Sequence, residues 1–97
     1  MVDKVKLALR ISHDHLDSDI NETIETARAE LIRSGCSEKY ANSEHALIVA
    51  AIKTYCMSVY TNDEKRAQGF FESWKYQLDN IRKSTEPKLI GESDSDV

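Results

Sequence analysis

The sequence lacks the residues that usually connect β-strands. It has three glycines and one proline, and no glycine follows an asparagine or an aspartate, so the common two-residue hairpin turns are missing. Residues that favour helices, such as Ala, Leu, Glu, Lys and Arg, are instead frequent. A chain of 97 residues has room for one hydrophobic core. We therefore expect a single all-α domain, a small bundle of four to five helices with an apolar central helix.

The sequence also lacks a long apolar run. The longest covers residues 46–52 and ends at Lys53, well short of the roughly 20 residues that cross a bilayer. The N-terminus has no basic block followed by an apolar block, as a signal peptide would have. Cys36 and Cys56 do not have the spacing of a metal or redox motif. We expect a reduced cytoplasmic protein without a membrane span.

An excess of positive charge is missing as well. The net charge is −4, and Glu92, Asp94 and Asp96 supply three of the negative charges, so the rest of the chain is nearly neutral. No series of Lys and Arg residues is interleaved with aromatic residues. Sequence-independent binding to nucleic acid through many phosphate contacts is therefore not expected.

The sequence does contain apolar residues at helical spacing. We expect helices over residues 2–11, 19–34, about 43–60 and 63–83, with a turn-rich link at 35–42 that offers caps at Ser37 and Ser43. Asp19 and Glu22 form a capping-box pattern, and Gly35 stands where a left-handed residue ends the second helix. Gly69 is a weak point in the last helix, and two shorter helices meeting there are an alternative.

Each expected helix has a face predicted to be buried. The outer faces of the second helix are expected to carry the charge pairs Glu25–Arg28 and Glu30–Arg33. Lys4, Lys6 and Arg10 are expected to point outward from the first helix. The residues predicted to be buried are Val2, Val5 and Leu9, then Ile20, Ile24, Ala27 and Leu31, then Ile48, Ile52, Tyr55 and Val59, and finally Ala67, Phe71, Trp74, Leu78 and Ile81.

No set of residues predicts catalysis or metal binding. His13, Asp14 and His15, with Asp17 and Asp19, are ligand types that suit a divalent ion. Alternate residues converge only on an extended backbone, however, and we interpret them as a solvated connector. A calcium loop starting at Asp17 fails, because Glu22 replaces its glycine and Arg28 its last glutamate.

The two cysteines give no catalytic site either. Cys36 has a histidine, His45, in the next segment, but no carboxylate or oxyanion loop is implied, and we interpret Cys36 as a small residue in a turn. Cys56 lies in the apolar central helix and is predicted to be core. We expect a protein that is not an enzyme, with no catalytic residue, cofactor or metal.

Residues 1–86 are predicted to form the helical domain and 87–97 a disordered acidic tail or a partner-binding arm. Beyond Pro87 the segment has one apolar pair, followed by glycine and an acidic run that cannot form a core. The predicted partner-binding residues are Glu86, Pro87, Lys88, Leu89 and Ile90.

Five short segments form a recognisable series. They are a basic and apolar opening helix, an acidic connector, a second helix with spaced isoleucines, the turn after the central helix and the end of the last helix. Over about residues 4–83, the series resembles the small helical head-to-tail connector proteins of long-tailed bacteriophages and prophages, also called adaptor, DNA-packaging or head-completion proteins. The residues that carry the resemblance are Leu9, Arg10, Ile11, Asp14, Asp17, Ile20, Ile24, Ala27, Arg28, Tyr60, Asn62, Glu64, Leu78, Ile81 and Arg82.

The resemblance implies a structural role in virion assembly. Copies of the protein would form a ring, twelve-fold in number, between the portal protein and a tail-side stopper or completion protein, and the ring would continue the DNA channel. Assembly would take place in the bacterial cytoplasm and the ring would lie at the head–tail junction. Because basic side chains would retain DNA, we expect a lumen poor in Lys and Arg, not lined by Lys65, Arg66 or Lys75.

The alternative is a small DNA-binding or regulatory adaptor of the helix-turn-helix type, with the Gly35 region as the turn. That link is longer than the usual three or four residues. The helix after it is apolar, whereas a recognition helix must be polar and basic. We therefore favour the connector hypothesis.

Overall fold

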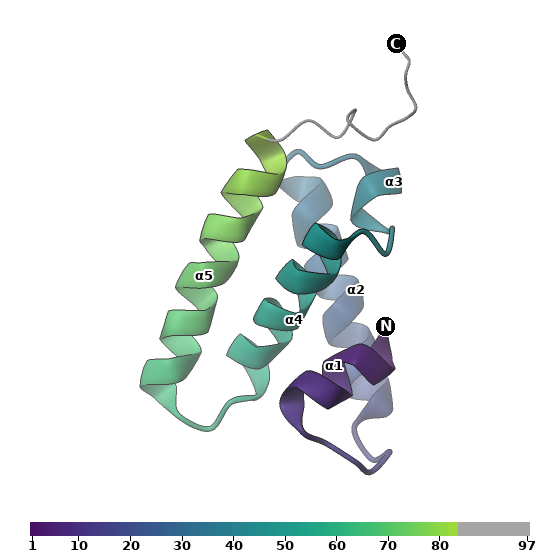
Figure 1. Cartoon of the computed structure of the whole chain (residues 1–97), viewed down its shortest axis with the longest axis vertical. Helices are drawn as coiled ribbons and strands as arrows, with labels where there is room; N and C mark the ends of the chain where they lie inside the picture. The colour runs from purple at the N-terminus through teal and green to yellow at the C-terminus, as the bar shows by residue number, and fades with distance from the viewer. Residues whose placement is uncertain (84–97) are drawn as a thin grey trace.

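The computed structural model describes residues 1–83, which form five helices and no strand (Figure 1). The predicted all-α bundle is therefore confirmed. The helices are α1 (Val2–Leu9), α2 (Asp17–Arg33), α3 (Glu38–Ala41), α4 (Ala46–Tyr60) and α5 (Glu64–Lys83).

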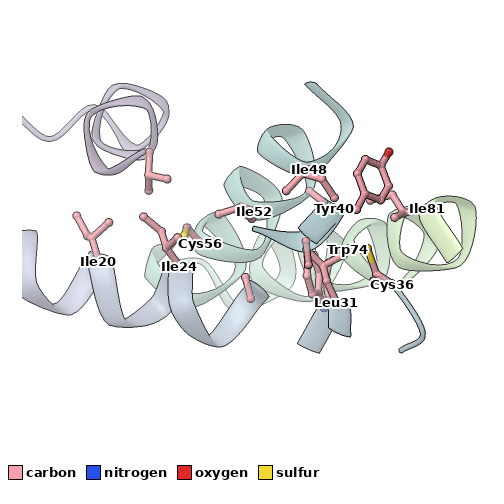
Figure 2. Packing of buried hydrophobic residues seen from close by; sticks show 14 residues of the cluster. Ile20, Ile24, Leu31, Cys36, Tyr40, Ile48, Ile52, Cys56, Trp74 and Ile81 are labelled. Carbon is pink, nitrogen blue, oxygen red and sulfur yellow. The ribbon is translucent and has the colours of Figure 1, made fainter. Parts of the chain in front are cut away.

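Helix α4 is the centre of the fold. It packs against α1, α2 and α5, and α3 packs against α2. Helices α4 and α5 run side by side in opposite directions as a hairpin (Figure 1). Figure 2 shows the hydrophobic core between the helices, with side chains from α2, α4 and α5 and from the α3 segment. The most deeply buried side chains include Ile20, Ile24, Leu31, Ile48 and Ile52.

The end of α2 agrees with the prediction, whereas its start does not. Gly35 has a φ of 116°, and the N–H of Cys36 donates to the carbonyl of Leu31 at 3.0 Å, which closes the helix end. The helix begins at Asp17, two residues before the predicted cap at Asp19. Its N-cap residue, Leu16, makes no side-chain hydrogen bond, so the capping-box prediction is wrong. The acidic residues of this turn still lie where the helix dipole favours negative charge.

Helix α1 is two residues shorter than predicted. It ends at Leu9, because Arg10 takes a left-handed conformation with a φ of 61°. The N–H of Ile11 then donates to the carbonyl of Lys6 at 2.9 Å. This closing bond reverses the chain toward the connector that precedes α2.

The predicted turn-rich link contains the short helix α3. The Oγ of Ser37 accepts a hydrogen bond from the N–H of Tyr40 at 3.1 Å, as expected for a cap. Ser43 does not cap α4. That helix begins at Ala46, and its cap is His45, whose Nδ1 accepts from the N–H of Leu47.

Helix α5 is continuous through Gly69, so the alternative of two shorter helices is wrong. Asp63 caps α5, because its Oδ1 accepts from the N–H groups of Lys65 and Arg66 at 2.9 and 3.2 Å. A Cβ at Gly69 would meet no atom within 4 Å. The helix therefore tolerates the glycine on an open face.

Two of the residues predicted to be buried are exposed. On α4 the buried side chains Ile48, Ile52 and Cys56 are four residues apart and form one row along the helix. Val59 lies in the neighbouring row and is 52% exposed. In α5, which contacts mainly α4, Trp74 and Ile81 are buried, but Phe71 is 44% exposed. The predicted seams are therefore correct near one end of the hairpin and wrong near the other.

None of the described helices is long and apolar enough to cross a membrane. The predicted domain boundary at residue 86, the acidic tail and the residues Glu86, Pro87, Lys88, Leu89 and Ile90 lie outside the described residues. They stay predictions.

Candidate interaction surfaces

Arg28 is the one buried charged residue among residues 1–82. Its guanidinium donates to the carbonyl oxygens of Ala41 at 2.7 Å and Ser43 at 3.1 Å, and to Glu44 Oε2 at 3.1 Å. The predicted outward pair of Arg28 with Glu25 is therefore wrong. Arg28 follows Ile24 by four residues and precedes Leu31 by three, so it shares their buried face. The fork of the guanidinium holds the segment between α3 and α4 against α2.

Glu44 joins this arrangement to the N-terminus. Its carboxylate also accepts from Lys4 Nζ at 3.3 Å. Partial burial alone would raise the pKa of Glu44, but the hydrogen bonds from Lys4 and Arg28 lower it below its usual range. The carboxylate is therefore ionised near neutral pH, and helices α1, α2 and α4 are linked through it.

Lys6 contradicts the prediction that it points outward. Its side chain is 12% exposed, and its Nζ lies 2.8 Å from Asp14 Oδ1 and 2.9 Å from Asp17 Oδ1. Hydrogen bonding with Asp14 and then Asp17 raises the pKa of Lys6, and the bond from Lys6 lowers the pKa of Asp14. Asp14 and Asp17, the two acidic residues of the pattern that resembles connector proteins, therefore hold the link between α1 and α2 against α1.

Four of the residues that carry the resemblance to connector proteins line one cleft. Leu9 and Arg10 at the end of α1 meet Tyr60 and Asn62 at the end of α4 around a cleft of about 580 Å³, which we call the α1 cleft. The hydroxyl of Tyr60 is hydrogen-bonded to that of Thr23 at 3.1 Å, which fixes the inner wall. The cleft is lined by Ala8, Leu9, Arg10, Met57, Tyr60, Thr61, Asn62, Arg66 and Phe70.

Arg66 and Phe70, which the pattern does not include, form the α5 wall of the α1 cleft. The guanidinium of Arg66 lies 5.8 Å from the centre of the Phe70 ring. With Arg10, the cleft thus has two exposed cations beside aromatic and amide groups. Such a lining suits an acidic segment of a protein partner. Only the four-residue spacing of Arg66 and Phe70 on one helix face could have indicated this wall from the sequence.

The other pattern residues do not gather at one site. Ile20, Ile24, Ala27 and Ile81 are buried in the core, and Ile11 and Leu78 pack against it. Arg82 pairs with Asp79 at 2.8 Å. Asp14, Glu64 and Arg82 are exposed at separate places, and the α1 cleft is where four residues of the pattern meet.

A second surface lies between α4 and α5 next to their connecting turn. The groove has a volume of about 460 Å³ and contains the exposed Val59 and Phe71, and we call it the turn groove. Lys75 Nζ lies 5.5 Å from the centre of the Phe71 ring. The residues that line the turn groove are Tyr55, Ser58, Val59, Glu64, Ala67, Gln68 and Phe71.

The described residues contain no group of three or more His, Cys, Asp or Glu side chains arranged to hold a metal ion. The rings of His13 and His15 lie 4.9 Å apart, and the Nδ1 of His13 accepts from the N–H of His15. Cys36 and Cys56 are buried thiols, and burial raises the pKa of Cys56 to about 12. The core position predicted for Cys56 is confirmed.

Comparisons with protein-family models, with curated proteins and with solved structures find no match to this chain. Inferences about its function therefore depend on its own residues and on where they lie.

Proposed function

We propose that the protein is a structural head-to-tail connector of a bacteriophage or prophage, in which copies form a ring between the portal protein and a tail-side protein. It acts without catalysis or a cofactor, by joining protein surfaces around the DNA channel. The proposal rests on the resemblance of the residue pattern to that of connector proteins and on one structural observation, the exposed apolar side chains of the turn groove.

The turn groove supports association because it leaves large apolar side chains in water. Val59 is 52% and Phe71 is 44% exposed, and they lie in one groove with Tyr55 and Ala67. Apolar side chains gathered at one place on a small domain are typical of a protein-binding surface. A closed ring needs such a face to meet a different face of the next copy.

The α1 cleft offers a second contact of different character. Its cations, Arg10 and Arg66, suit an acidic segment, such as one on a portal or tail-side protein. In such a ring Arg66 would be engaged by the partner and would not line the bore, as the expectation of a lumen poor in Lys and Arg requires.

The helix-turn-helix alternative has no comparable support. The helix after the Gly35 turn is α3, which has only four residues, and the next helix, α4, is surrounded by α1, α2 and α5. Lys53 is the single basic residue of α4. A recognition helix needs an exposed polar face that enters the major groove.

The test is assembly with the portal protein encoded in the same genome. The two proteins are produced together, purified through the portal, and examined by native mass spectrometry and electron microscopy. We expect a ring of this chain on the portal. Replacing Val59 and Phe71 by serine should abolish the ring and leave the fold intact, because about half of each residue is exposed and neither belongs to the buried core.

Tyr76→Ser is the matched control, because Tyr76 is an aromatic residue of the same helix that is 69% exposed and lies outside the groove. This variant should still form rings. Failure of the unmodified chain to associate with portal or tail-side proteins would overturn the connector proposal. Rings formed equally well by the Val59 and Phe71 variant would instead remove the turn groove from the interface.

A further inference from the structure

Helices α4 and α5 also form a smaller hollow near the other end of their hairpin. It has a volume of about 190 Å³ and is lined by Leu47, Ala50, Gln77, Asn80 and Ile81, and we call it the Leu47 groove. Leu47, on the first turn of α4, is 49% exposed. The groove therefore presents an apolar side chain beside the last turns of α5.

The Leu47 groove contains a polar atom that needs a donor. Gln77 Oε1 is inaccessible to solvent and accepts no hydrogen bond from the residues that the structure describes. A buried acceptor is unfavourable when it is left unpaired. An occupant that matches the groove would bring an apolar side chain. It would also bring an N–H group, which pairs with Gln77 Oε1 once the Gln77 side chain rotates to present this covered atom to the groove.

A second hollow adjoins this groove across Ala50. Lys4, Glu44 and Lys53 are among its lining residues, and we call it the Lys53 hollow. Lys4 is paired with Glu44 at 3.3 Å, whereas Lys53 forms no ion pair within residues 1–83. Ala46 and Ala50 on this face are small and exposed, so a backbone can approach α4 closely. The matching occupant would carry negative charge next to its apolar residues.

The chain itself contains such a segment. After α5 ends at Lys83, one apolar pair, Leu89 and Ile90, is followed by Gly91 and three acidic residues without a base. Leu89 follows Lys83 by six positions, and an extended chain of that length spans up to about 20 Å. Gln77 lies only six residues before Lys83 on the helix, about 9 Å along its axis. The apolar pair can therefore reach the Leu47 groove of its own chain.

We propose that in the free subunit residues 89–96 fold back across α4. Leu89 and Ile90 occupy the Leu47 groove, and the carboxylates that follow lie over Lys53. The Gln77 side chain rotates toward the groove, and its Oε1 then accepts from a backbone N–H of this segment. The segment is thus held by its own domain until a partner displaces it. This proposal concerns the free subunit and does not depend on the connector function.

The test places a nitroxide spin label in the segment of the full chain. Ser93→Cys provides the thiol, since Cys36 and Cys56 are buried and Cys56 has a pKa of about 12. In a dilute ¹⁵N-labelled sample, we expect the amide signals of residues 47–53 and 77–81 to lose intensity. Signals of residues 23–27 in α2 serve as the internal control and should keep theirs.

Two variants identify the contacts that hold the segment. Leu89→Ser with Ile90→Ser in the labelled chain should restore the intensities, and Lys53→Gln should restore them in part. Neither change touches the core. Full intensity in the unmodified labelled chain, or a loss that persists in the double variant, would overturn the proposal. A loss in ¹⁵N-labelled copies that carry no spin label, mixed with spin-labelled copies, would assign the groove to a second copy and overturn it as well.

Discussion

The two ends of the α4–α5 hairpin differ in how completely they are covered. At the end where α4 begins, which we call the α3 end, Trp74 and Ile81 of α5 join the core with Leu31, Cys36 and Tyr40 (Figure 2). At the end near the connecting turn, the core consists of α1, α2 and α4, and the first turns of α5 leave Phe71 exposed. One helix thus serves as a core element over its second half and as a surface over its first half.

The difference shows that apolar spacing alone does not decide burial. Phe71 and Trp74 are three residues apart on α5 and both belong to a regular apolar series. Trp74 is buried because α2 and the α3 segment reach it, and its ring lies 4.8 Å from that of Tyr55. Phe71 has no such neighbour, and the apolar series continues there on the exposed surface.

The largest expected effect tests this comparison directly. Trp74→Ala should lower the free energy of unfolding by about 3 to 5 kcal/mol, because it removes a large buried side chain. Phe71→Ala should lower it by about 1 kcal/mol, because much of the ring is already in water. Urea denaturation followed by circular dichroism measures both. Equal losses would show that the two ends are covered alike.

The next effect concerns Arg28, which holds the α3 end together. Arg28→Met should lower the free energy of unfolding by about 2 to 3 kcal/mol, because the buried carbonyl of Ala41 loses its donor. Arg28→Lys should recover only part of this loss, since an ammonium cannot reproduce the planar fork.

Glu25→Ala is the control for Arg28. Its side chain is exposed and does not pair with Arg28, so the stability should change by no more than about 0.5 kcal/mol. A large effect of Glu25→Ala, or none of Arg28→Met, would contradict the buried position of the guanidinium. The same urea titration distinguishes these outcomes.

The two described glycines should respond with opposite signs. Gly35→Ala should cost about 1 to 2 kcal/mol, because a φ of 116° is unfavourable for a residue with a Cβ. Gly69→Ala should stabilise the protein by about 0.5 to 1 kcal/mol, since Gly69 lies inside a helix with open space around it. Thermal unfolding of both variants measures the signs. A destabilising Gly69→Ala would mean that the first turns of α5 are not a regular exposed helix.

The smallest effect is a pH dependence of the stability that comes from Lys6 and Asp14, at the link between α1 and α2. The pKa of Asp14 is lower in the folded protein than its value of 3.8 in the unfolded chain. The ionised Asp14 therefore stabilises the fold at pH values above 3.8, and this contribution is lost as the pH falls through the lower pKa of the folded state. The pKa of Lys6 is higher in the folded protein than its value of 10.5 in the unfolded chain. The charged Lys6 therefore stabilises the fold at pH values below 10.5, and this contribution is lost as the pH rises through the higher pKa of the folded state.

Lys6→Met should therefore flatten the stability profile at both extremes. The effect is small because Asp14 is largely in solvent. Urea midpoints measured across the pH range test it, with Lys75→Met as a control for an exposed lysine near Glu72. A profile unchanged by Lys6→Met would mean that the connector is not held by this lysine.

The sequence was sufficient for the fold class and for most helices. The spacing of Ile20, Ile24 and Leu31 and the apolar character of α4 correctly predicted the core, because their periodicity is a local property. The stop at Gly35 was also predictable, since few other residues accept its conformation. These features depend on one helix at a time.

The surfaces depend on how helices meet, and the sequence did not reveal them. Arg28 looked like an outward partner of Glu25, because spacing along a helix does not show which carbonyl groups lie opposite. The α1 cleft brings together Arg10 and Arg66, which are 56 positions apart in the chain. Val59 was assigned to the wrong row because the position of α5 decides which row is covered. These are tertiary properties.

The hydrogen bonds from Arg28 to the segment before α4 also determine where the chain can change in length. Residues 41–44 accept three bonds from one side chain, so an inserted residue there would pull carbonyl groups away from the guanidinium. The turn at residues 61–63 is held by short-range hydrogen bonds of its own. An inserted tag or a longer loop would fit there without disturbing the core. Relatives of this protein should accordingly keep the first segment fixed in length and vary the second.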